Sequence, residues 1–253
     1  MSIRIHHFAL IVLAALSFGA QAEDAGYLAP AQMPNIKLWL STAPAKGSAA
    51  DAADVEVFKA TRAVLHTARG QMAAEDDVYD APQVITRFNE ALGVALTPAN
   101  APVLLKLLKK AQSDGANAVA PMKLALSDGG RVRPFVAYPG SDTCLEPVDM
   151  AGRRHNDVDV FHIEKTGSYP STHALTGMIF AMVLSEVAPE RSDAVTARGM
   201  EFGRSRVVCG FHYESDVTAG RLVAAVVFAR LQADPAFAGD MAQAIKEVQA
   251  ARH

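Results

Sequence analysis

Ser205-Arg-Val-Val-Cys-Gly-Phe-His-Tyr-Glu-Ser-Asp216 joins two segments in which apolar residues recur at helical spacing. The first segment runs from about residue 189 to residue 208. The second continues through Val217 and Leu222 to Leu231. The junction holds glycine, histidine and carboxylates, which a simple helical hairpin does not need. These residues therefore predict two long helices with polar side chains gathered between them.

Further helical patterns extend outward from this junction. They cover residues 171–184 and 235–250, and a stretch after Ser48 that has Val55, Phe58 and Leu65 on one face. Residues 81–92 form another such pattern, with Val84, Phe88 and Leu92 as its apolar stripe. Thr97-Pro98 is expected to begin a further helix, whose apolar face consists of Val103, Leu104, Leu107 and Leu108. Residues 127–164 are rich in glycine and proline and predict loop. Alternating strand patterns are scarce, so we expect an all-α fold, a single helical-bundle domain.

The composition is that of a globular protein with one sizeable core. Of its 253 residues 50% are hydrophobic and 20% are charged, and the pI is near 6.2. That balance argues against a dedicated nucleic-acid binder. Residues 1–22 combine Arg4, an apolar run and Ala20-Gln21-Ala22, which predicts a signal peptide, a periplasmic location and a domain over 23–253. An uncleaved membrane anchor is the alternative.

Two cysteines, Cys144 and Cys209, lie in the part that follows the signal. An even count in an exported chain permits one disulfide, which would hold the segment after Arg133 against the segment of His212. Two buried free thiols explain the same count. The residues alone leave both possibilities open.

His212 and Asp216 are four residues apart, which would place them on one helix face within hydrogen-bond reach. A carboxylate there fixes the imidazole tautomer and leaves the other ring nitrogen available as a nucleophile or base. Arg206, six residues earlier, brings a guanidinium that matches phosphate oxygens. An ordinary surface His–Asp pair is the competing interpretation.

Residues 167–173, Gly-Ser-Tyr-Pro-Ser-Thr-His, directly precede an apolar helix. A helix N-terminus offers free backbone N–H groups and a positive dipole end, which suit a phosphate. Ser171 and Thr172 add hydroxyl or backbone donors, and His173 would lie beside the anion as a general acid. A simple helix cap with an incidental histidine fits the pattern equally well.

Two weaker features complete the inventory of polar residues. Arg131 and Arg133 precede Pro134 and would add guanidinium groups to an anion site. The alternative is that both arginines lie in a solvent-exposed loop and bind nothing. Residues 155–162 contain two histidines and two aspartates, but their alternating spacing matches neither a helix face nor a known zinc pattern. We therefore predict no metal site.

Together these segments resemble the phosphatidic acid phosphatase type 2 superfamily and, within it, the class A bacterial non-specific acid phosphatases. The family pattern has three blocks. The first is a lysine followed after six residues by Arg-Pro, and the second is Pro-Ser-Gly-His. The last is Ser-Arg followed after five residues by a histidine and, after three more, by an aspartate. The last block is matched at every fixed position from Ser205 to Asp216. The flanks Val-Cys-Gly, Ser-Asp-Val and Gly-Ser-Tyr-Pro-Ser are also similar, and the resemblance covers nearly the whole chain after the signal.

Two positions depart from this pattern. Thr172 replaces the glycine of Pro-Ser-Gly-His, but its backbone N–H remains. The position seven before Arg133 is Leu126, and Lys123 lies three residues further upstream. A three-residue insertion around Gly129-Gly130 would keep Lys123 as the family's lysine, and loss of that phosphate ligand is the alternative.

The resemblance implies a metal-independent acid phosphatase with no cofactor. It implies that His212 attacks phosphorus and forms a phosphohistidine, that Asp216 orients His212, and that His173 protonates the leaving group. It further implies a set of phosphate ligands made of Arg133, Arg206, Ser171, Thr172 and Lys123. The expected partners are small phosphomonoesters. We expect no nucleic acid and no stable membrane association after signal cleavage, and a homo-oligomer is compatible with the resemblance.

Three rival functions remain at this point. A vanadium-dependent haloperoxidase shares the fold and the anion-site motifs, with vanadate in place of phosphate. A lipid phosphatase is usually polytopic, and this chain has no long apolar helix after residue 22. A catalytically dead phosphate-binding protein would explain the displaced lysine but not the retained His173, His212 and Asp216.

Overall fold

The computed structural model describes residues 25–144 and 165–252. The described helices are α1 (Ala49–Thr61), α2 (Ala68–Glu75), α3 (Ala81–Thr86), α4 (Asn89–Leu92), α5 (Pro102–Val119), α6 (Pro134–Ala137), α8 (Thr172–Val187), α9 (Ser192–Val208), α10 (Glu214–Leu231) and α11 (Pro235–Ala251), with short 3-10 turns between them. In these ranges the only extended pairing is an isolated bridge between Ala125 and Thr166. The predicted all-α fold is confirmed.

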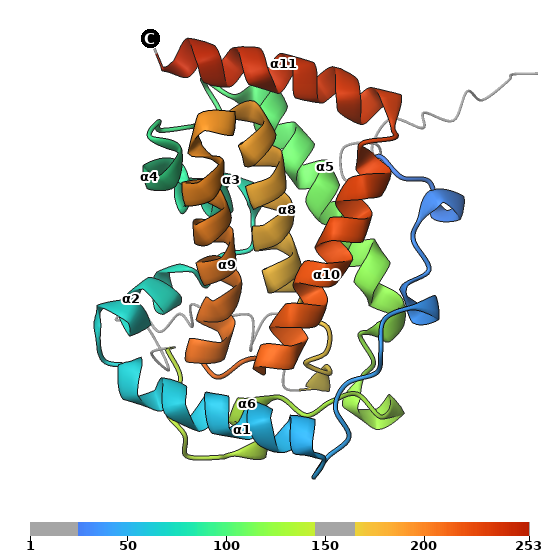
Figure 1. Cartoon of the computed structure of the whole chain (residues 1–253), viewed down its shortest axis with the longest axis vertical. Coiled ribbons are helices and arrows are strands. Elements are labelled where there is room, and N and C mark those ends of the chain that lie inside the picture. Colours follow the sequence, from blue (N-terminus) through green and yellow to red (C-terminus); the bar gives the residue numbers. More distant parts are fainter. Residues whose placement is uncertain (1–24, 145–164, 253) are drawn as a thin grey trace, which may run out of the picture.

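Helix α8 is the centre of the bundle. Its residues are apolar on nearly all sides, and a helix of that composition is stable in water only when neighbours surround it. Helices α9 and α10 pack along it most extensively, and α5 covers a further side. In Figure 1, α11 crosses one end of these four helices and α1 crosses the other. The N-terminus of α8 therefore lies at the α1 end of the bundle.

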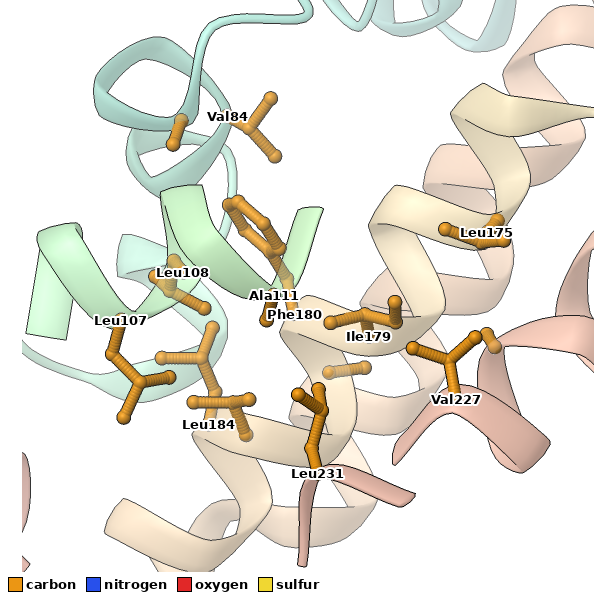
Figure 2. Packing of buried hydrophobic residues seen from close by; sticks show 14 of the residues in the cluster. Val84, Leu107, Leu108, Ala111, Leu175, Ile179, Phe180, Leu184, Val227 and Leu231 are labelled. Atoms are coloured by element: carbon orange, nitrogen blue, oxygen red, sulfur yellow. The ribbon is translucent and has the colours of Figure 1, made fainter. Parts of the chain in front are cut away.

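Aromatic and branched side chains from four helices fill the space around α8 (Figure 2). Phe180 of α8 is fully buried, and its ring centroid lies 6.4 Å from that of Phe88, which in turn lies 6.1 Å from Phe202 of α9. Leu107 and Leu108 of α5 close the same cluster. Burial of one such side chain contributes roughly 1.5–3 kcal/mol, so this cluster holds α8 in a fixed position.

Glycines allow the central helices to approach closely. A Cβ atom added at Gly199 would lie 2.8 Å from the backbone oxygen of Gly177, and one added at Gly220 would lie 2.2 Å from that of Ser171. Real Cβ atoms essentially never come that near to another backbone. The start of α8 and the second turn of α10 are therefore in direct backbone contact.

Two predicted elements in the N-terminal half differ from the structure. The stripe Val84, Phe88 and Leu92 is buried as expected, but the helix breaks after Thr86 and resumes at Asn89. The helix expected to open at Thr97-Pro98 begins at Pro102. Its capping signal is satisfied locally instead, because Asn100 accepts hydrogen bonds from the backbone and hydroxyl of Thr97.

The remaining expectations on helices are largely met. Ser48 caps α1 by accepting from the backbone N–H of Asp51, and helices are present after residues 171, 189, 212 and 235. The described part of 127–164 is mostly loop, with the single turn α6. The predicted signal peptide and the doubted metal segment at His155–His162 lie outside the described residues.

No single helix in residues 25–144 and 165–252 is long and apolar enough to cross a membrane. The successive helices α10 and α11 meet that criterion only as a pair, and they are bent by 97° at their junction.

Candidate active site

His212 and Asp216 lie at the start of α10 and are both buried, with exposures of 4% and 0%. His212 precedes the helix, in the turn opened by Gly210 at a φ of +80°, rather than on the helix face that the spacing predicted. The two groups are nevertheless neighbours: the imidazole Nδ1 lies 3.4 Å from Asp216 Oδ2, within ion-pair distance, and has no hydrogen-bond partner among the described residues. That same oxygen accepts from the backbone N–H of Tyr213 at 2.8 Å, which fixes the carboxylate at the helix N-terminus.

The other ring nitrogen of His212 faces a guanidinium. Nε2 lies 3.1 Å from Nη1 of Arg133, a group that only donates, so this geometry favours a lone pair on Nε2 and the proton on Nδ1. Nδ1 then faces the carboxylate of Asp216. This is the tautomer in which an imidazole can attack through Nε2.

Arg133 donates to several backbone carbonyls and to the hydroxyl of Thr166. It lies at the N-terminus of α6 and is 4% exposed. It donates to the carbonyl oxygens of Phe211 (3.2 Å), Thr166 (3.2 Å) and Gly167 (3.3 Å). These carbonyls orient the guanidinium, and its Nη1 is directed at the imidazole of His212.

Ser171, Thr172 and His173 form the N-terminus of α8 beside this pair. Ser171 is the cap: its hydroxyl oxygen accepts from the backbone N–H of Ala174 at 3.2 Å, and its own N–H donates to the carbonyl of Asp216 at 2.9 Å. First-turn N–H groups have no intrahelical acceptor, so those of Thr172 and His173 lie at the positive end of the helix. A glycine-to-threonine change at position 172 leaves this donor in place.

His173 is held by an aromatic neighbour and is 5% exposed. Its ring stacks on Phe202 at a centroid distance of 4.3 Å with an angle of 7° between the planes. Its Nε2 has no hydrogen-bond partner among the described residues. Burial, followed by the charge of Arg206, lowers the pKa of His173 well below its usual value.

Lys123 reaches the same region in spite of its displaced position. Its ammonium donates to the carbonyl of Pro170 at 2.7 Å and to that of Ser168 at 3.3 Å, directly before the start of α8. Burial, and then the nearby charge of Arg133, lowers the pKa of Lys123 well below the ordinary lysine value. A 3-10 turn and Gly129, at a φ of +83°, accommodate the extra residues between Lys123 and Arg133.

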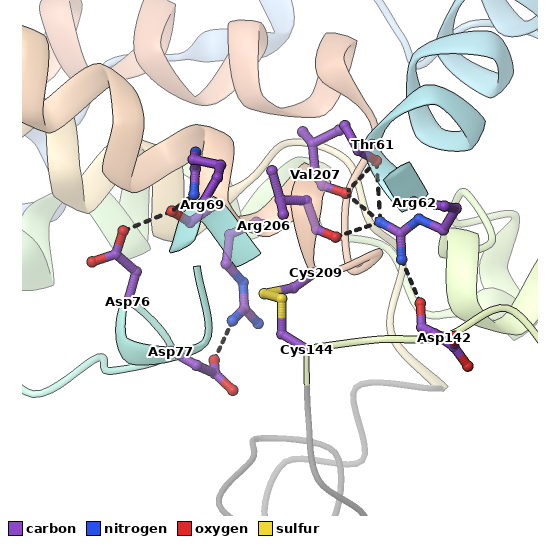
Figure 3. Close-up of a disulfide and its surroundings, with 12 residues drawn as sticks. Thr61, Arg62, Arg69, Asp76, Asp77, Asp142, Cys144, Arg206, Val207 and Cys209 are labelled. Carbon is purple, nitrogen blue, oxygen red and sulfur yellow. Dashed lines mark hydrogen bonds and ion pairs between the residues drawn. A yellow bond between two sulfur atoms is a disulfide. The ribbon is translucent and has the colours of Figure 1, made fainter. Parts of the chain in front are cut away.

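Arg206 projects from the last turn of α9 and is 3% exposed. Its guanidinium forms an ion pair with Asp77 (Figure 3). It also lies over the ring of Phe211, 4.4 Å from the centroid. The sequence did not single out Asp77. The acidic run Glu75-Asp76-Asp77 at the end of α2 was the available signal, but nothing in it indicated which arginine it would meet.

Positive charge dominates the surroundings of the two imidazoles. Burial lowers the pKa of His212 well below its usual value, and Arg133, Lys123 and Arg206 lower it further, in that order. The two guanidinium groups and the amine of Lys123 beside these rings form a site whose electrostatics favour a bound anion. No cluster of three His, Cys, Asp or Glu side chains suited to a metal is found in the described ranges.

Arg131 does not join these cations. Its guanidinium pairs with the carboxylates of Asp216, Asp54 and Asp51, and the last two come from α1. The predictions did not include Asp54. Its position on the same helix face as Phe58, at a spacing of four, was the sequence signal for a buried acid.

A disulfide between Cys144 and Cys209 links the segment after α6 to the end of α9 (Figure 3). The bridge that the two cysteines permitted is therefore present. Arg62 reinforces the same junction by donating to the carbonyls of Val207 and Asp142. The covalent link fixes the chain three residues before His212, and a closed loop of this length contributes stability of about 4 kcal/mol.

The two lowered histidine pKa values predict an acid-sensitive stability. Below about pH 6.5 the unfolded chain protonates these imidazoles while the fold resists protonation, so the unfolded state binds more protons. The free energy of unfolding should therefore fall as the pH drops from about 6.5, by up to about 1.4 kcal/mol per pH unit for each imidazole. Urea denaturation without phosphate measures this slope.

Two controls accompany that measurement. His212→Ala should flatten the slope, and His66→Ala should not, because the side chain of His66 is 82% exposed. Millimolar phosphate should stabilise the protein more at pH 5 than at pH 7.5. Stability that rises on acidification would contradict the prediction.

Comparison with known proteins places this site in a family. The family model of the PAP2 superfamily matches residues 120–235, which include the sequence segments discussed above. The chain is 35% identical over 224 residues to a non-specific acid phosphatase of Providencia stuartii, covering 88% of this chain and 85% of that protein. It is 36% identical over 220 residues to a non-specific acid phosphatase of Salmonella typhimurium, covering 87% and 82%.

An acid phosphatase of Zymomonas mobilis is 34% identical over 215 residues, which cover 85% of this chain and 76% of that protein. The chain belongs to the PAP2 superfamily and, within it, to the non-specific acid phosphatases. The resemblance noted from its motifs is confirmed.

Proposed function

We propose that the protein is an exported acid phosphatase that hydrolyses phosphomonoesters through a phosphohistidine on His212, without a metal. The observation that carries this proposal is the orientation of His212, with Nε2 3.1 Å from Arg133 and Nδ1 3.4 Å from Asp216. An imidazole held in this way presents its lone pair beside a guanidinium that can bind a phosphoryl oxygen.

The first half of the reaction transfers the phosphoryl group to the enzyme. The Nε2 lone pair of His212 forms a bond to phosphorus while the bond between phosphorus and the ester oxygen breaks. Asp216 stabilises the positive charge that develops on the ring. His173, in its protonated form, gives its proton to the leaving alkoxide.

The second half of the reaction regenerates the free enzyme. Neutral His173 takes a proton from water, whose oxygen forms a bond to phosphorus while the P–N bond to His212 breaks. The lowered pKa of His173 keeps its ring neutral, so a lone pair is available to accept the proton in this step. The negative charge of a bound phosphoryl group offsets the nearby Arg206, which favours the protonated form in the first step.

The proposed phosphate ligands are Arg133, Arg206, Ser171, the backbone of Thr172 and Lys123. Arg206 is paired with Asp77 in the structure, so phosphate binding would require the guanidinium to share or exchange that partner. Arginine suits this because it carries donors on more than one edge. Phosphoryl transfer depends mainly on positioning and charge, and these groups supply both.

Export is supported by two independent features. Residues 1–22 have the pattern of a signal peptide. The Cys144–Cys209 disulfide fits an oxidising compartment such as the periplasm, because cytosolic thiols are kept reduced.

A turnover assay with p-nitrophenyl phosphate tests the proposed function. Protein purified from the periplasm should release p-nitrophenol fastest below neutral pH, keep its activity in EDTA, and be inhibited by vanadate. Loss of activity in EDTA that zinc or magnesium restores would refute the metal-independent mechanism. Halide oxidation with vanadate and peroxide in place of turnover would indicate a haloperoxidase, and phosphate binding without turnover would indicate a catalytically dead binding protein.

Lys123→Ala tests the assignment of the displaced lysine. A charge-assisted contact to phosphate contributes on the order of 1.5–3 kcal/mol, so its loss should lower kcat/KM roughly ten- to hundred-fold and weaken inhibition by phosphate. Lys106→Ala is the matched control, because Lys106 is exposed on α5, and it should behave as the parent. Parental kinetics for Lys123→Ala would show that this lysine is not a phosphate ligand.

A further inference from the structure

Arg131 makes a second set of contacts to the carboxylate that orients His212. Its Nη1 donates to Asp216 Oδ1 at 2.9 Å and to the hydroxyl of Ser215 at 2.8 Å. Its guanidinium carbon lies 3.9 Å from the ring centroid of Tyr213. The side chain is only 7% exposed, so these contacts form largely out of solvent.

The two oxygens of Asp216 therefore have different partners. Oδ2 faces His212 Nδ1 and the Tyr213 backbone, and Oδ1 is bound by Arg131. A carboxylate held at both oxygens cannot rotate about its terminal bond without breaking a contact. The Arg131 contact thus fixes the plane in which Oδ2 meets the imidazole.

The opposite edge of Arg131 is anchored in α1. Nη2 donates to Asp54 Oδ2 at 2.8 Å and to Asp51 Oδ1 at 3.2 Å. Asp54 in turn accepts from the backbone N–H of Ser215 at 3.0 Å. This connection makes α1 a rigid support for the start of α10, where Asp216 and His212 lie.

Charge balance explains why an arginine is needed at this position. Burial alone would lower the pKa of Arg131, but Asp216 and Asp54 reverse this effect and raise it above the usual value. Asp216 is fully buried, and a buried carboxylate that loses its partner is strongly destabilised. Without Arg131 we expect the Asp216 carboxylate to turn away from its present position, which removes its contact with His212.

We propose that Arg131 is a positioning residue for the phosphoryl-transfer reaction, acting on His212 through Asp216. The inference rests on the proposed function of His212. Removal of the hydrogen-bond partner behind a metal ligand typically lowers activity 10- to 100-fold, and we expect a similar factor for the partner behind Asp216. We expect Arg131→Ala to lower kcat by about that factor with KM changed less than about threefold, since Arg131 does not bind the phosphate itself.

A double-mutant cycle with Asp216→Asn separates this role from a general loss of stability. If Arg131 acts through Asp216, then Arg131→Ala should lower kcat by less than about threefold in the Asp216→Asn background. Arg191→Ala is the control, because Arg191 is a partly buried arginine that binds the carbonyl of Ala91 at 2.9 Å. It should lower the Tm without changing kcat.

Chemical rescue adds a readout that a structural role would not give. Arg131 lines an open cavity of about 870 Å³, through which a small cation can reach its place. Methylguanidinium should therefore restore part of the kcat of Arg131→Ala, and tetramethylammonium should not. Arg131→Lys keeps the charge with fewer donors, and it should retain more activity than the alanine variant. If the alanine variant does not fold, the same cycle is run with the lysine variant.

The outcomes distinguish this inference from the function on which it rests. A parent protein that fails to turn over p-nitrophenyl phosphate would refute the proposed function. The role of Arg131 alone would be overturned if the parent is active and the Arg131 variants keep its full kcat. It would also be overturned if Arg131→Ala lowers kcat by the same factor in the parent and in the Asp216→Asn background.

Discussion

His212→Ala should reduce turnover of p-nitrophenyl phosphate by at least about 10⁴-fold while leaving the fold intact. The expected loss is large because removal of a covalent nucleophile leaves only the binding contribution to catalysis. The fold should survive because His212 lies in the turn before α10, outside the apolar cluster that holds the bundle together. Circular dichroism and urea denaturation check the fold.

A trapped phosphoenzyme identifies the attacking atom. Brief reaction of the parent followed by quenching should yield a phosphorylated chain that survives alkali and is hydrolysed by acid, as expected for a phosphoramidate bond to histidine. The His212 variant should yield none, and His66→Ala should yield the parental amount. An acid-stable adduct or an active His212→Ala enzyme would disprove the assignment.

The second large effect concerns His173 and should depend on the substrate. Replacement of a general acid typically costs 10²- to 10⁴-fold, but a leaving group as weakly basic as p-nitrophenolate needs little help from a proton. The His173→Ala variant should therefore still be phosphorylated readily by p-nitrophenyl phosphate, but its phosphoenzyme should hydrolyse slowly because the base that activates water is missing. With an alkyl phosphate, the variant should already be slow in the phosphorylation step.

Rapid-quench kinetics separate these two steps. With p-nitrophenyl phosphate the variant should release about one equivalent of p-nitrophenol in a burst, followed by slow turnover. With an alkyl phosphate it should show no burst. Equal losses on both substrates without a burst would contradict a role for His173 in leaving-group protonation. A large decrease in Tm would instead attribute the loss to the ring that stacks on Phe202.

The helices were predictable where burial imposes a regular apolar period. Helix α8 begins at the residue after Ser171 as expected, because its cap and apolar run are both local signals. The start of α5 was not predictable from Thr97-Pro98, because a side chain three residues later completes a competing turn. A local signal of this kind shows that a cap exists but not which element it begins.

In the candidate site, too, contacts between residues close in sequence were predictable and contacts between distant residues were not. His212 and Asp216 are close in sequence, and their proximity was predicted, although the turn at Gly210 and not a shared helix face brings them together. The partners Asp77 of Arg206 and Asp54 of Arg131 are 129 and 77 residues away, and only the packed bundle brings them together. Sequence motifs therefore predicted the groups of the site but not the acids that hold the arginines.

The backbone contact between Gly220 and Ser171 limits how this chain can vary. Gly220 carries no functional group, yet any side chain there would collide with the carbonyl of Ser171, where an added Cβ would lie 2.2 Å away. Relief of that collision would shift the start of α8 and move the Thr172 and His173 N–H groups relative to His212. Loss of activity after substitution at this glycine would thus reflect displaced donors and not a missing chemical group. Sensitivity of such a glycine to substitution therefore measures how closely the two helices must pack. It does not identify a catalytic residue, which must carry a reactive atom.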